Sequence, residues 1–224
     1  MNRYSVEGKK VFLTGASGWL GSAMASALTE EGATVVSPER KDFTSAGLWR
    51  FTELNGPLDV LVNNAHPMDW ATRRDMANHY EAAVDWPLWA IAASKEHLEK
   101  NGGSIINIAS MYALIAPNPK LYEGTEYPQN PLDYGASKAA MLAMTRYIAS
   151  FWGKFGVRCN AICPGAFPKP TVDDSFQKRL ADRTVLGRVG KPDDLIGAVL
   201  YLASDASSYM TGQALVIDGG WTIT

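Results

Sequence analysis

Residues 9–21 of the chain read KKVFLTGASGWLG, and this stretch decides the fold class. An apolar, strand-like run at 10–13 leads directly into a glycine-rich turn, after which a helical pattern begins. In the turn, Gly15, Gly18 and Gly21 leave room for a sharp bend and for close approach of backbone N–H groups to an anion. The stretch therefore predicts a strand, a turn and a helix whose N-terminus can bind a phosphate or pyrophosphate.

The same alternation of apolar runs and helical patterns continues along the chain. Further strand-like runs occupy 33–37, 58–65, 104–110, 157–165 and 214–220. Helical patterns begin near Gly18, span 79–99, and follow Tyr134 and Pro192. This order predicts an α/β protein with a doubly wound, Rossmann-like parallel sheet, formed as a single domain over residues 1–224.

The composition favours a soluble protein that binds a small molecule. The chain carries 21 basic and 23 acidic residues, so no basic field attracts nucleic acid or an anionic membrane. Residues 1–10 lack the apolar core of a signal peptide, and no apolar run is long enough to cross a bilayer, so we expect a cytoplasmic location. Cys159 and Cys163 are predicted to be buried hydrophobic residues, and no metal site is predicted.

Tyr134 and Lys138 carry the sharpest chemical signal. They lie four residues apart at the start of a helical pattern, so the lysine ammonium is expected close to the tyrosine phenol. A free tyrosine has a pKa of about 10, and a neighbouring positive charge favours the phenolate. Tyr134 is therefore predicted to be a general acid and base for a carbonyl or alcohol oxygen, with Lys138 lowering its pKa.

Together these motifs resemble the short-chain dehydrogenase/reductase family over nearly the whole chain. The resemblance rests on the glycine turn, NNA at 63–65, the strand-ending Ser110, YGASK at 134–138 and the Pro164-Gly165 pair. It implies a hydride transfer between NAD(P) and a secondary alcohol or ketone, in which Ser110 orients the substrate oxygen and Lys138 also holds the nicotinamide ribose. The stretch 186–221 matches the family closely and implies a homodimer or homotetramer.

The cofactor is expected to be NAD, with NADP left open. Glu39 follows the second strand, where a carboxylate can bind ribose hydroxyls and repel a 2′-phosphate. Arg40 can instead pair with that phosphate. The residues expected to bind the cofactor are Gly15, Ser17, Gly18, Trp19, Leu20, Glu39, Arg40, Asp42, Asn64, Ala65, Tyr134, Lys138, Pro164, Gly165 and Phe167.

The chain departs from the family pattern in four places. Trp19 stands where compact members carry their middle glycine. Asp42 follows the second strand almost at once, which predicts that one αβ unit is lost and that the sheet has six strands. Residues 80–93 lack the Asn that family members use in a proton relay, and Asp85 is the nearest polar replacement. His66 replaces the glycine after NNA; it could reach substrate, although no partner for it is visible.

Residues 111–133 predict a long loop beside the active site, and 164–186 predict a second irregular segment that covers the substrate. The tyrosines and polar groups of the first loop favour a sugar-like or polyol substrate. LYEGT at 121–125 resembles a subgroup linked to polysaccharide and nonulosonic-acid pathways. Gluconate-like polyols and 3-oxoacyl thioesters stay open as substrates, as does a loop that only packs on a neighbouring subunit.

Two other functions stay open. The spacing TGxxGxxG is typical of sugar-nucleotide epimerases and dehydratases, although those relatives usually have a larger substrate domain. A non-catalytic dinucleotide-binding sensor is suggested by Trp19 and the lost αβ unit. The joint presence of Ser110, Tyr134 and Lys138 favours the oxidoreductase.

Overall fold

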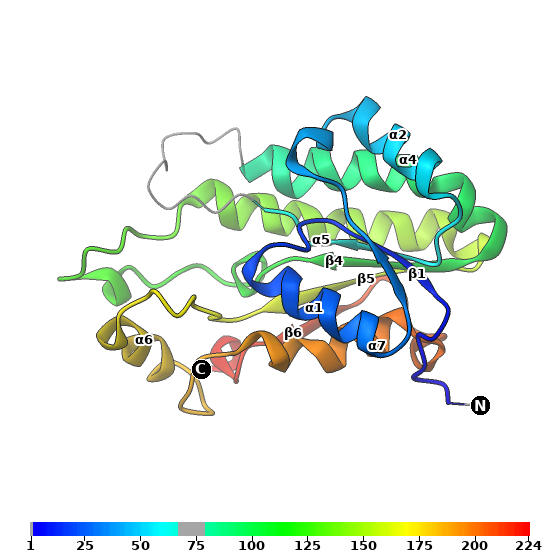
Figure 1. Cartoon of the computed structure of the whole chain (residues 1–224). Coiled ribbons are helices and arrows are strands. Elements are labelled where there is room, and N and C mark those ends of the chain that lie inside the picture. The colour runs from blue at the N-terminus through cyan, green and yellow to red at the C-terminus, as the bar shows by residue number, and fades with distance from the viewer. Residues whose placement is uncertain (1, 67–78) are drawn as a thin grey trace.

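A computed structural model describes residues 2–66 and 79–224 (Figure 1). Its centre is a six-stranded parallel sheet with the strand order β2-β1-β3-β4-β5-β6. The strands are β1 Lys10–Leu13, β2 Thr34–Val36, β3 Val60–Asn63, β4 Gly103–Ile108, β5 Val157–Pro164 and β6 Ala214–Ile217. The predicted doubly wound sheet of six strands is confirmed.

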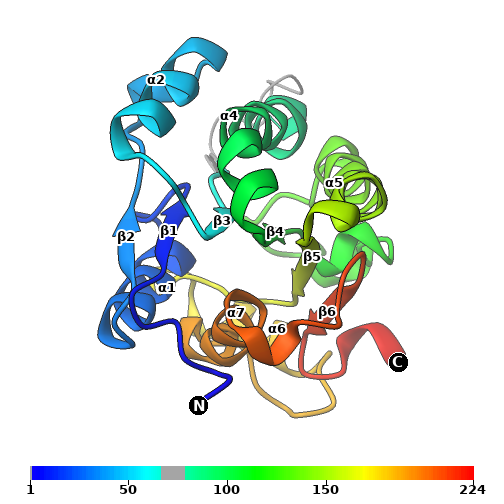
Figure 2. The ribbon, with the colours of Figure 1, turned by 90° about the vertical axis from the view of Figure 1, so that its right-hand side faces the viewer.

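Helices cover both faces of this sheet (Figure 2). One face carries α1 Trp19–Glu30 and α7 Ile196–Ala203, and the other carries α2 Ser45–Asn55, α4 Trp86–Asn101 and α5 Leu132–Trp152. Because side chains alternate along a strand, Val11 and Leu13 pack towards α1 and α7 while Phe12 packs towards α2 and α4. The central strands are buried on both faces, which explains their almost continuous apolar sequence.

The chain order changes direction between β1 and β3. From β1 the chain passes outwards to the edge strand β2, and it then returns to place β3 on the other side of β1. In open α/β sheets a ligand crevice forms at such a switch point, beyond the carboxyl ends of the strands. The connections that follow β4 and β5 lie at this same end, on the left in Figure 1.

Two helices were not predicted. Helix α2 begins after Thr44, whose side chain accepts the N–H of Gly47 at 3.0 Å, and it ends at Gly56 with a positive φ of 70°. Helix α6, Asp174–Ala181, lies inside the segment predicted to be irregular, and its N-cap Asp173 accepts the N–H of Phe176 at 2.9 Å. Helix α6 has only eight residues, and both helices bury just two side chains each, Leu48 and Thr52 in α2 and Phe176 and Leu180 in α6.

One smaller difference concerns the catalytic helix. Helix α5 begins at Leu132, so Tyr134 lies in its first turn rather than before it. Cys159 and Cys163 are buried and free, as predicted, and both lie within β5. Among the described residues, no helix combines the length and the apolar character needed to cross a membrane.

Candidate active site

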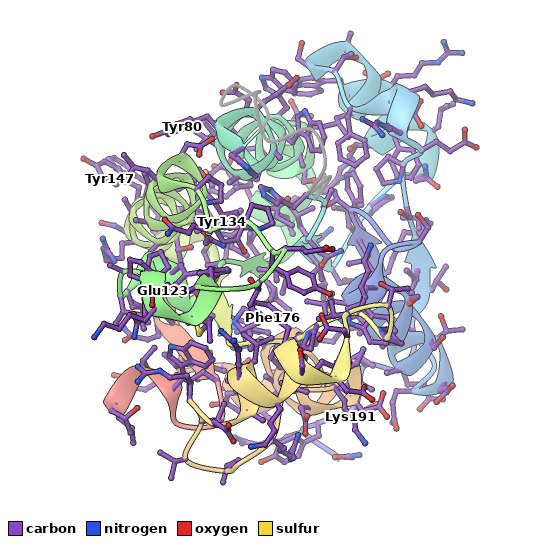
Figure 3. All side chains as sticks on the ribbon, turned by 90° about the vertical axis from the view of Figure 1, so that its left-hand side faces the viewer. Tyr80, Glu123, Tyr134, Tyr147, Phe176 and Lys191 are labelled. Carbon is purple, nitrogen blue, oxygen red and sulfur yellow. The ribbon has the colours of Figure 1, made fainter. Side chains whose placement is uncertain are left out.

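The structure brings Ser110, Tyr134 and Lys138 together at the carboxyl end of β4. Ser110 follows that strand, and its hydroxyl accepts the N–H of Tyr112 at 3.2 Å. Its hydroxyl also lies near enough to the Tyr134 phenol to act on the pKa of that group, in the lowering direction. The Lys138 ammonium donates to the carbonyl oxygen of Ile108 at 2.8 Å and lies 5.9 Å from the centroid of the Tyr134 ring. Figure 3 shows Tyr134 towards the middle of this end of the molecule.

Helix α5 presents this pair because its inner face is apolar. The buried residues of the helix include Lys138, Met141, Leu142, Thr145 and Ala149, which recur every three or four positions. Lys138 is only 4% exposed, so its alkyl stem packs in the core and its ammonium reaches the edge of the sheet.

A chain of buried side-chain hydrogen bonds fixes the strands beneath the site. Asn63 Nδ2 donates to Asn107 Oδ1 at 2.8 Å, and Asn107 Nδ2 donates to Thr145 Oγ1 at 2.9 Å. These contacts link β3, β4 and α5. Asn107 therefore has a structural role, because both of its contacts are internal to the fold.

Burial dominates the electrostatics of the site. It lowers the pKa of Lys138 to about 8 and raises the pKa of Tyr134, while the hydrogen bond from Ser110 acts in the lowering direction on Tyr134. The expectation that Lys138 lowers the pKa of Tyr134 is therefore not met in this structure. The reason is that removing the phenol from water disfavours the phenolate more than its surroundings stabilise it.

The glycine turn has the shape that a dinucleotide needs. Gly15 has a φ of 70°, and a Cβ there would lie 2.8 Å from Cα of Ala65. A Cβ on Gly21 would lie 2.0 Å from the carbonyl oxygen of Gly15. Gly18 begins α1 without a side-chain cap, and the first turn has no acidic residue. The bare, uncapped N-terminus fits an anionic pyrophosphate.

Asn64 and Ala65 hold this turn against β3. The backbone N–H groups of Asn64 and Ala65 donate to Thr14 Oγ1, at 2.9 and 3.0 Å. The side-chain amide of Asn64 also donates to the carbonyl oxygen of Gly15 at 3.1 Å. These contacts of Asn64 and Ala65, which were predicted to bind the cofactor, are internal to the fold and tie the glycine turn to β3.

Three predicted residues of the turn differ in environment. Ser17 is exposed, whereas Leu20 packs against the core that α1 and α7 share. Trp19 lines a cavity of about 680 Å³ together with one face of α1 and the segment that follows β5. Its indole N–H is buried and has no hydrogen-bond partner in the part of the chain that the structure describes.

The residues predicted to select the cofactor lie on the turn after β2. Glu39 and Arg40 are exposed, and Glu39 pairs with Lys41 at 2.8 Å. Asp42 accepts the N–H of Glu39 at 2.9 Å, so its carboxylate caps the turn. Lys41 was not considered from the sequence, and its charge offsets that of Glu39.

Pro164 and Gly165 end β5 as predicted. The Gly165 N–H donates to Ile217 at 2.9 Å, and a Cβ at Gly165 would lie 2.6 Å from Cα of Asp218. The ring of Phe167 covers Gly190, where a Cβ would approach it to 2.6 Å. This close packing places the turn beside Lys138 and Ser110 at the end of the sheet.

The long loop after Ser110 packs on α6. Tyr127 stacks on Phe176 with 4.3 Å between ring centroids, and its hydroxyl accepts the N–H of Asp173 at 3.1 Å. Arg179 donates to the carbonyl oxygen of Glu123 at 2.7 Å. Figure 3 shows Phe176 directed towards the middle of this end of the molecule, below Tyr134. The loop and α6 therefore form one wall of the site.

Two histidines adjoin Tyr134, and sequence reasoning missed their relationship. His66 Nε2 lies 3.0 Å from His79 Nδ1, so the expectation that His66 has no partner is wrong. Asp85, the expected replacement for the missing Asn, is exposed, whereas Ala83 faces the core beside Ala109. Only the tertiary fold brings the two histidines together, so the local sequence carried no signal for the pair.

Comparisons with known proteins agree with this geometry. Residues 40–222 match a family model described as enoyl-(acyl carrier protein) reductase. The 2-keto-3-deoxy-L-fuconate dehydrogenase of Xanthomonas campestris pv. campestris is 30% identical, over 97% of this chain and 81% of that protein. The 2-dehydro-3-deoxy-D-gluconate 5-dehydrogenase of Escherichia coli is 30% identical, over 99% of this chain and 98% of that protein.

Solved structures share the whole fold. A gluconate 5-dehydrogenase from Burkholderia cenocepacia, in complex with NADP and tartrate, has a TM-score of 0.85 at 26% identity and covers 100% of this chain and 98% of that one. A short chain dehydrogenase from Leptospira borgpetersenii with bound NAD+ has a TM-score of 0.83 at 25% identity and covers 97% and 94%.

Proposed function

The chain belongs to the short-chain dehydrogenase/reductase family, and we propose that it interconverts a secondary alcohol and a ketone of a sugar-acid-like or polyol substrate with NAD(P). The observation that carries this proposal is the position of Tyr134 at the carboxyl end of β4, where the buried ammonium of Lys138 lies 5.9 Å from its ring and Ser110 follows the strand. The relatives compared above are dehydrogenases of sugar acids, which supports oxidoreductase chemistry over the epimerase and sensor alternatives.

Ser110, Tyr134 and Lys138 have different roles at the substrate oxygen. Ser110 donates a hydrogen bond that holds the carbonyl oxygen, and Tyr134 gives that oxygen its phenolic proton as the ketone is reduced. In the oxidation, Tyr134 takes the proton of the substrate hydroxyl. When bound, NAD(P) supplies or accepts the hydride at the substrate carbon. Lys138 places a positive charge near the phenolate that forms, which limits the energetic cost of that charge.

The chain's own residues would hold the cofactor in a groove along the carboxyl ends of β1 and β3. The N-terminus of α1 and the bare backbone at Gly15 and Gly18 would bind the pyrophosphate. Lys138 would bind the nicotinamide ribose. Glu39 favours NAD, although its contact with Lys41 weakens that preference, and the solved relatives include complexes with both NADP and NAD+.

The sugar-like substrate is supported by the wall beside Tyr134. Tyr112 and Tyr122 hydrogen bond with each other there, and Tyr127 stacks on α6. Phenolic hydroxyls next to flat aromatic faces suit a ligand that has both hydroxyl groups and C–H faces. The sugar-acid substrates in the names of the relatives point to the same class.

We further propose that the chain acts as one domain over residues 1–224, in the cytoplasm, and as a homodimer or homotetramer. Two large aromatic side chains on the outer face of α5 support an assembly. Tyr147 and Phe151 are 66% and 63% exposed, and their rings stack with 6.1 Å between centroids. Apolar side chains gathered on one helix face often mark an interface.

Fluorescence titration with NADH and NADPH, followed by a rate assay, tests the proposed function. We expect NADH to bind more tightly than NADPH, and we expect reduction of keto sugar acids to exceed reduction of 3-oxoacyl thioesters. A protein that binds neither dinucleotide contradicts the proposal. Binding without turnover on any ketone would instead favour the sensor.

A further inference from the structure

His66, His79 and Tyr134 form a three-ring cluster. The imidazoles stack with 5.1 Å between centroids and an interplanar angle of 22°. Each of them meets the Tyr134 ring edge to face, His66 at 5.3 Å and His79 at 5.7 Å. The pair therefore packs directly on the residue that exchanges a proton with the substrate.

The two imidazoles share a hydrogen bond that requires opposite roles. With 3.0 Å between His66 Nε2 and His79 Nδ1, one nitrogen carries the proton and the other accepts it. Burial, and then the charge of Lys138, lowers the pKa of His66 to about 2, so this ring is neutral. Its second nitrogen, Nδ1, is buried and has no hydrogen-bond partner among the residues that the structure describes, whereas His79 is half-buried.

Tyr134 and Lys138 need a route by which protons reach solvent. Every turnover moves one proton to or from Tyr134, yet Lys138 is only 4% exposed and its ammonium is bound to the Ile108 carbonyl. Within residues 2–66 and 79–224, the ionisable groups beside this pair are His66, His79, Tyr112, Tyr122 and Cys163. Burial raises the pKa of the Cys163 thiol to about 11, which makes it a poor carrier near neutral pH.

We propose, on the basis of the proposed function, that His66 and His79 form a proton relay between Tyr134 and solvent. During reduction, Tyr134 gives its proton to the substrate oxygen and becomes a phenolate. A proton enters His79 at Nε2, and the Nδ1 proton of His79 passes to His66 Nε2 across their 3.0 Å contact. The His66 ring then turns against Tyr134 until its Nδ1, which has no partner among the described residues, reaches the phenolate and gives it the Nδ1 proton. Each imidazole gains one proton and loses one, so both stay neutral. The first tautomers return after the product leaves, when the His66 ring turns so that both of its nitrogens exchange protons with water.

The relay differs from simple packing in what it requires of residue 79. A packing role needs a ring of similar size, whereas the relay needs a ring with two exchangeable nitrogens. Imidazole meets both needs, and 1-methylimidazole meets only the first because its methyl group blocks one nitrogen. His97 offers a matched control, since it is half-buried near the far end of α4.

The test measures kcat for ketone reduction by the full chain carrying His79→Ala, with added imidazole or 1-methylimidazole. We expect kcat to fall by about tenfold or more, within the range of general acid–base effects, with KM and NADH affinity nearly unchanged. Imidazole should restore kcat in proportion to its concentration, and 1-methylimidazole should not. His97→Ala should retain the wild-type kcat with or without imidazole.

Several outcomes overturn the relay. One is equal rescue by both compounds, which would show that the ring only fills space, and another is a wild-type kcat in His79→Ala. Should His79→Ala fail to fold, His79→Asn keeps a hydrogen-bonding group near the position of Nδ1, and a wild-type kcat there would also exclude the relay. An active wild type with unaffected variants defeats the relay alone, whereas a wild type that reduces no ketone defeats the proposed function and the relay with it.

Discussion

The ammonium of Lys138 donates a 2.8 Å hydrogen bond to the carbonyl oxygen of Ile108, the last residue of β4. This contact joins the helix that carries Tyr134 to the strand that leads to Ser110. It also keeps a positive charge in a buried position, where the charge is unfavourable for folding but useful beside a phenolate. Lys138 thus lowers the stability of the fold while it supports the proposed reaction.

Lys138→Met should stabilise the protein near neutral pH while abolishing turnover. Burial lowers the pKa of Lys138 from 10.5 to about 8, a destabilisation of about 3 kcal/mol at pH 7. Loss of the bond to Ile108 offsets about 1 kcal/mol of this, so the free energy of unfolding should rise by about 2 kcal/mol. Urea denaturation at pH 7 measures the gain.

The extra stability of Lys138→Met over the wild type should decrease as the pH rises. Below pH 8 the lysine is charged in both the folded and the unfolded protein, so the full cost is present. Between pH 8 and 10.5 the folded protein loses this proton first, which stabilises the wild type relative to the variant. A difference that stays constant from pH 7 to 10.5 would contradict the lowered pKa.

Tyr134→Phe should remove turnover without removing the dinucleotide. The change deletes the proton donor and the partner of Ser110, so kcat should fall by about 10²-fold or more, while the affinity for NADH stays near the wild-type value. Single-turnover kinetics and fluorescence titration separate the two effects. Tyr147→Phe, on the exposed face of α5, is the matched control and should leave kcat unchanged.

Gly21→Ala should destabilise the glycine turn more than Gly18→Ala. A Cβ at Gly21 would lie 2.0 Å from the Gly15 oxygen, and the backbone must move by enough to cost about 1–3 kcal/mol. The atom nearest to a Cβ added at Gly18 lies 3.3 Å away, so Gly18→Ala should lower the free energy of unfolding by less than about 1 kcal/mol. Thermal unfolding of both variants measures which one loses more stability. Equal losses of stability would contradict the close packing described for Gly21.

Asp194→Asn should remove a stabilisation that disappears in acid. The two guanidinium nitrogens of Arg188 and the N–H of Lys191 lower the pKa of Asp194 to about 2. A carboxyl group whose pKa is lowered by folding stabilises the fold at any pH above its pKa in the unfolded protein, which is about 4. This contribution is lost as the pH falls towards 2, the pKa of Asp194 in the folded protein.

The urea midpoints of wild type and Asp194→Asn should therefore differ at pH 7 and converge near pH 2. Asp182→Asn is the comparison, because Asp182 forms an exposed pair with Lys178 on α6, and such pairs contribute little. If Asp182→Asn shows the same pH dependence, the bidentate contact of Arg188 with Asp194 is not its cause.

Local patterns in the sequence determined the sheet and the main chemical pair. Strand-like runs, the glycine turn and the four-residue spacing of Tyr134 and Lys138 each depend on neighbours along the chain, so they could be interpreted without coordinates. The early position of Asp42 predicted the missing αβ unit and hence six strands. Helices α2 and α6 escaped prediction because their stability depends on caps and on packing against distant elements.

Only the tertiary structure decided the environment of the site. Burial raises the pKa of Tyr134, and burial is a property of the whole fold. His66 follows β3 and His79 precedes α4, so their contact depends on where the two elements converge rather than on any spacing. Sequence periodicity reports which face of an element is apolar, whereas proton transfer depends on distances between elements, and those distances exist only once the chain has folded.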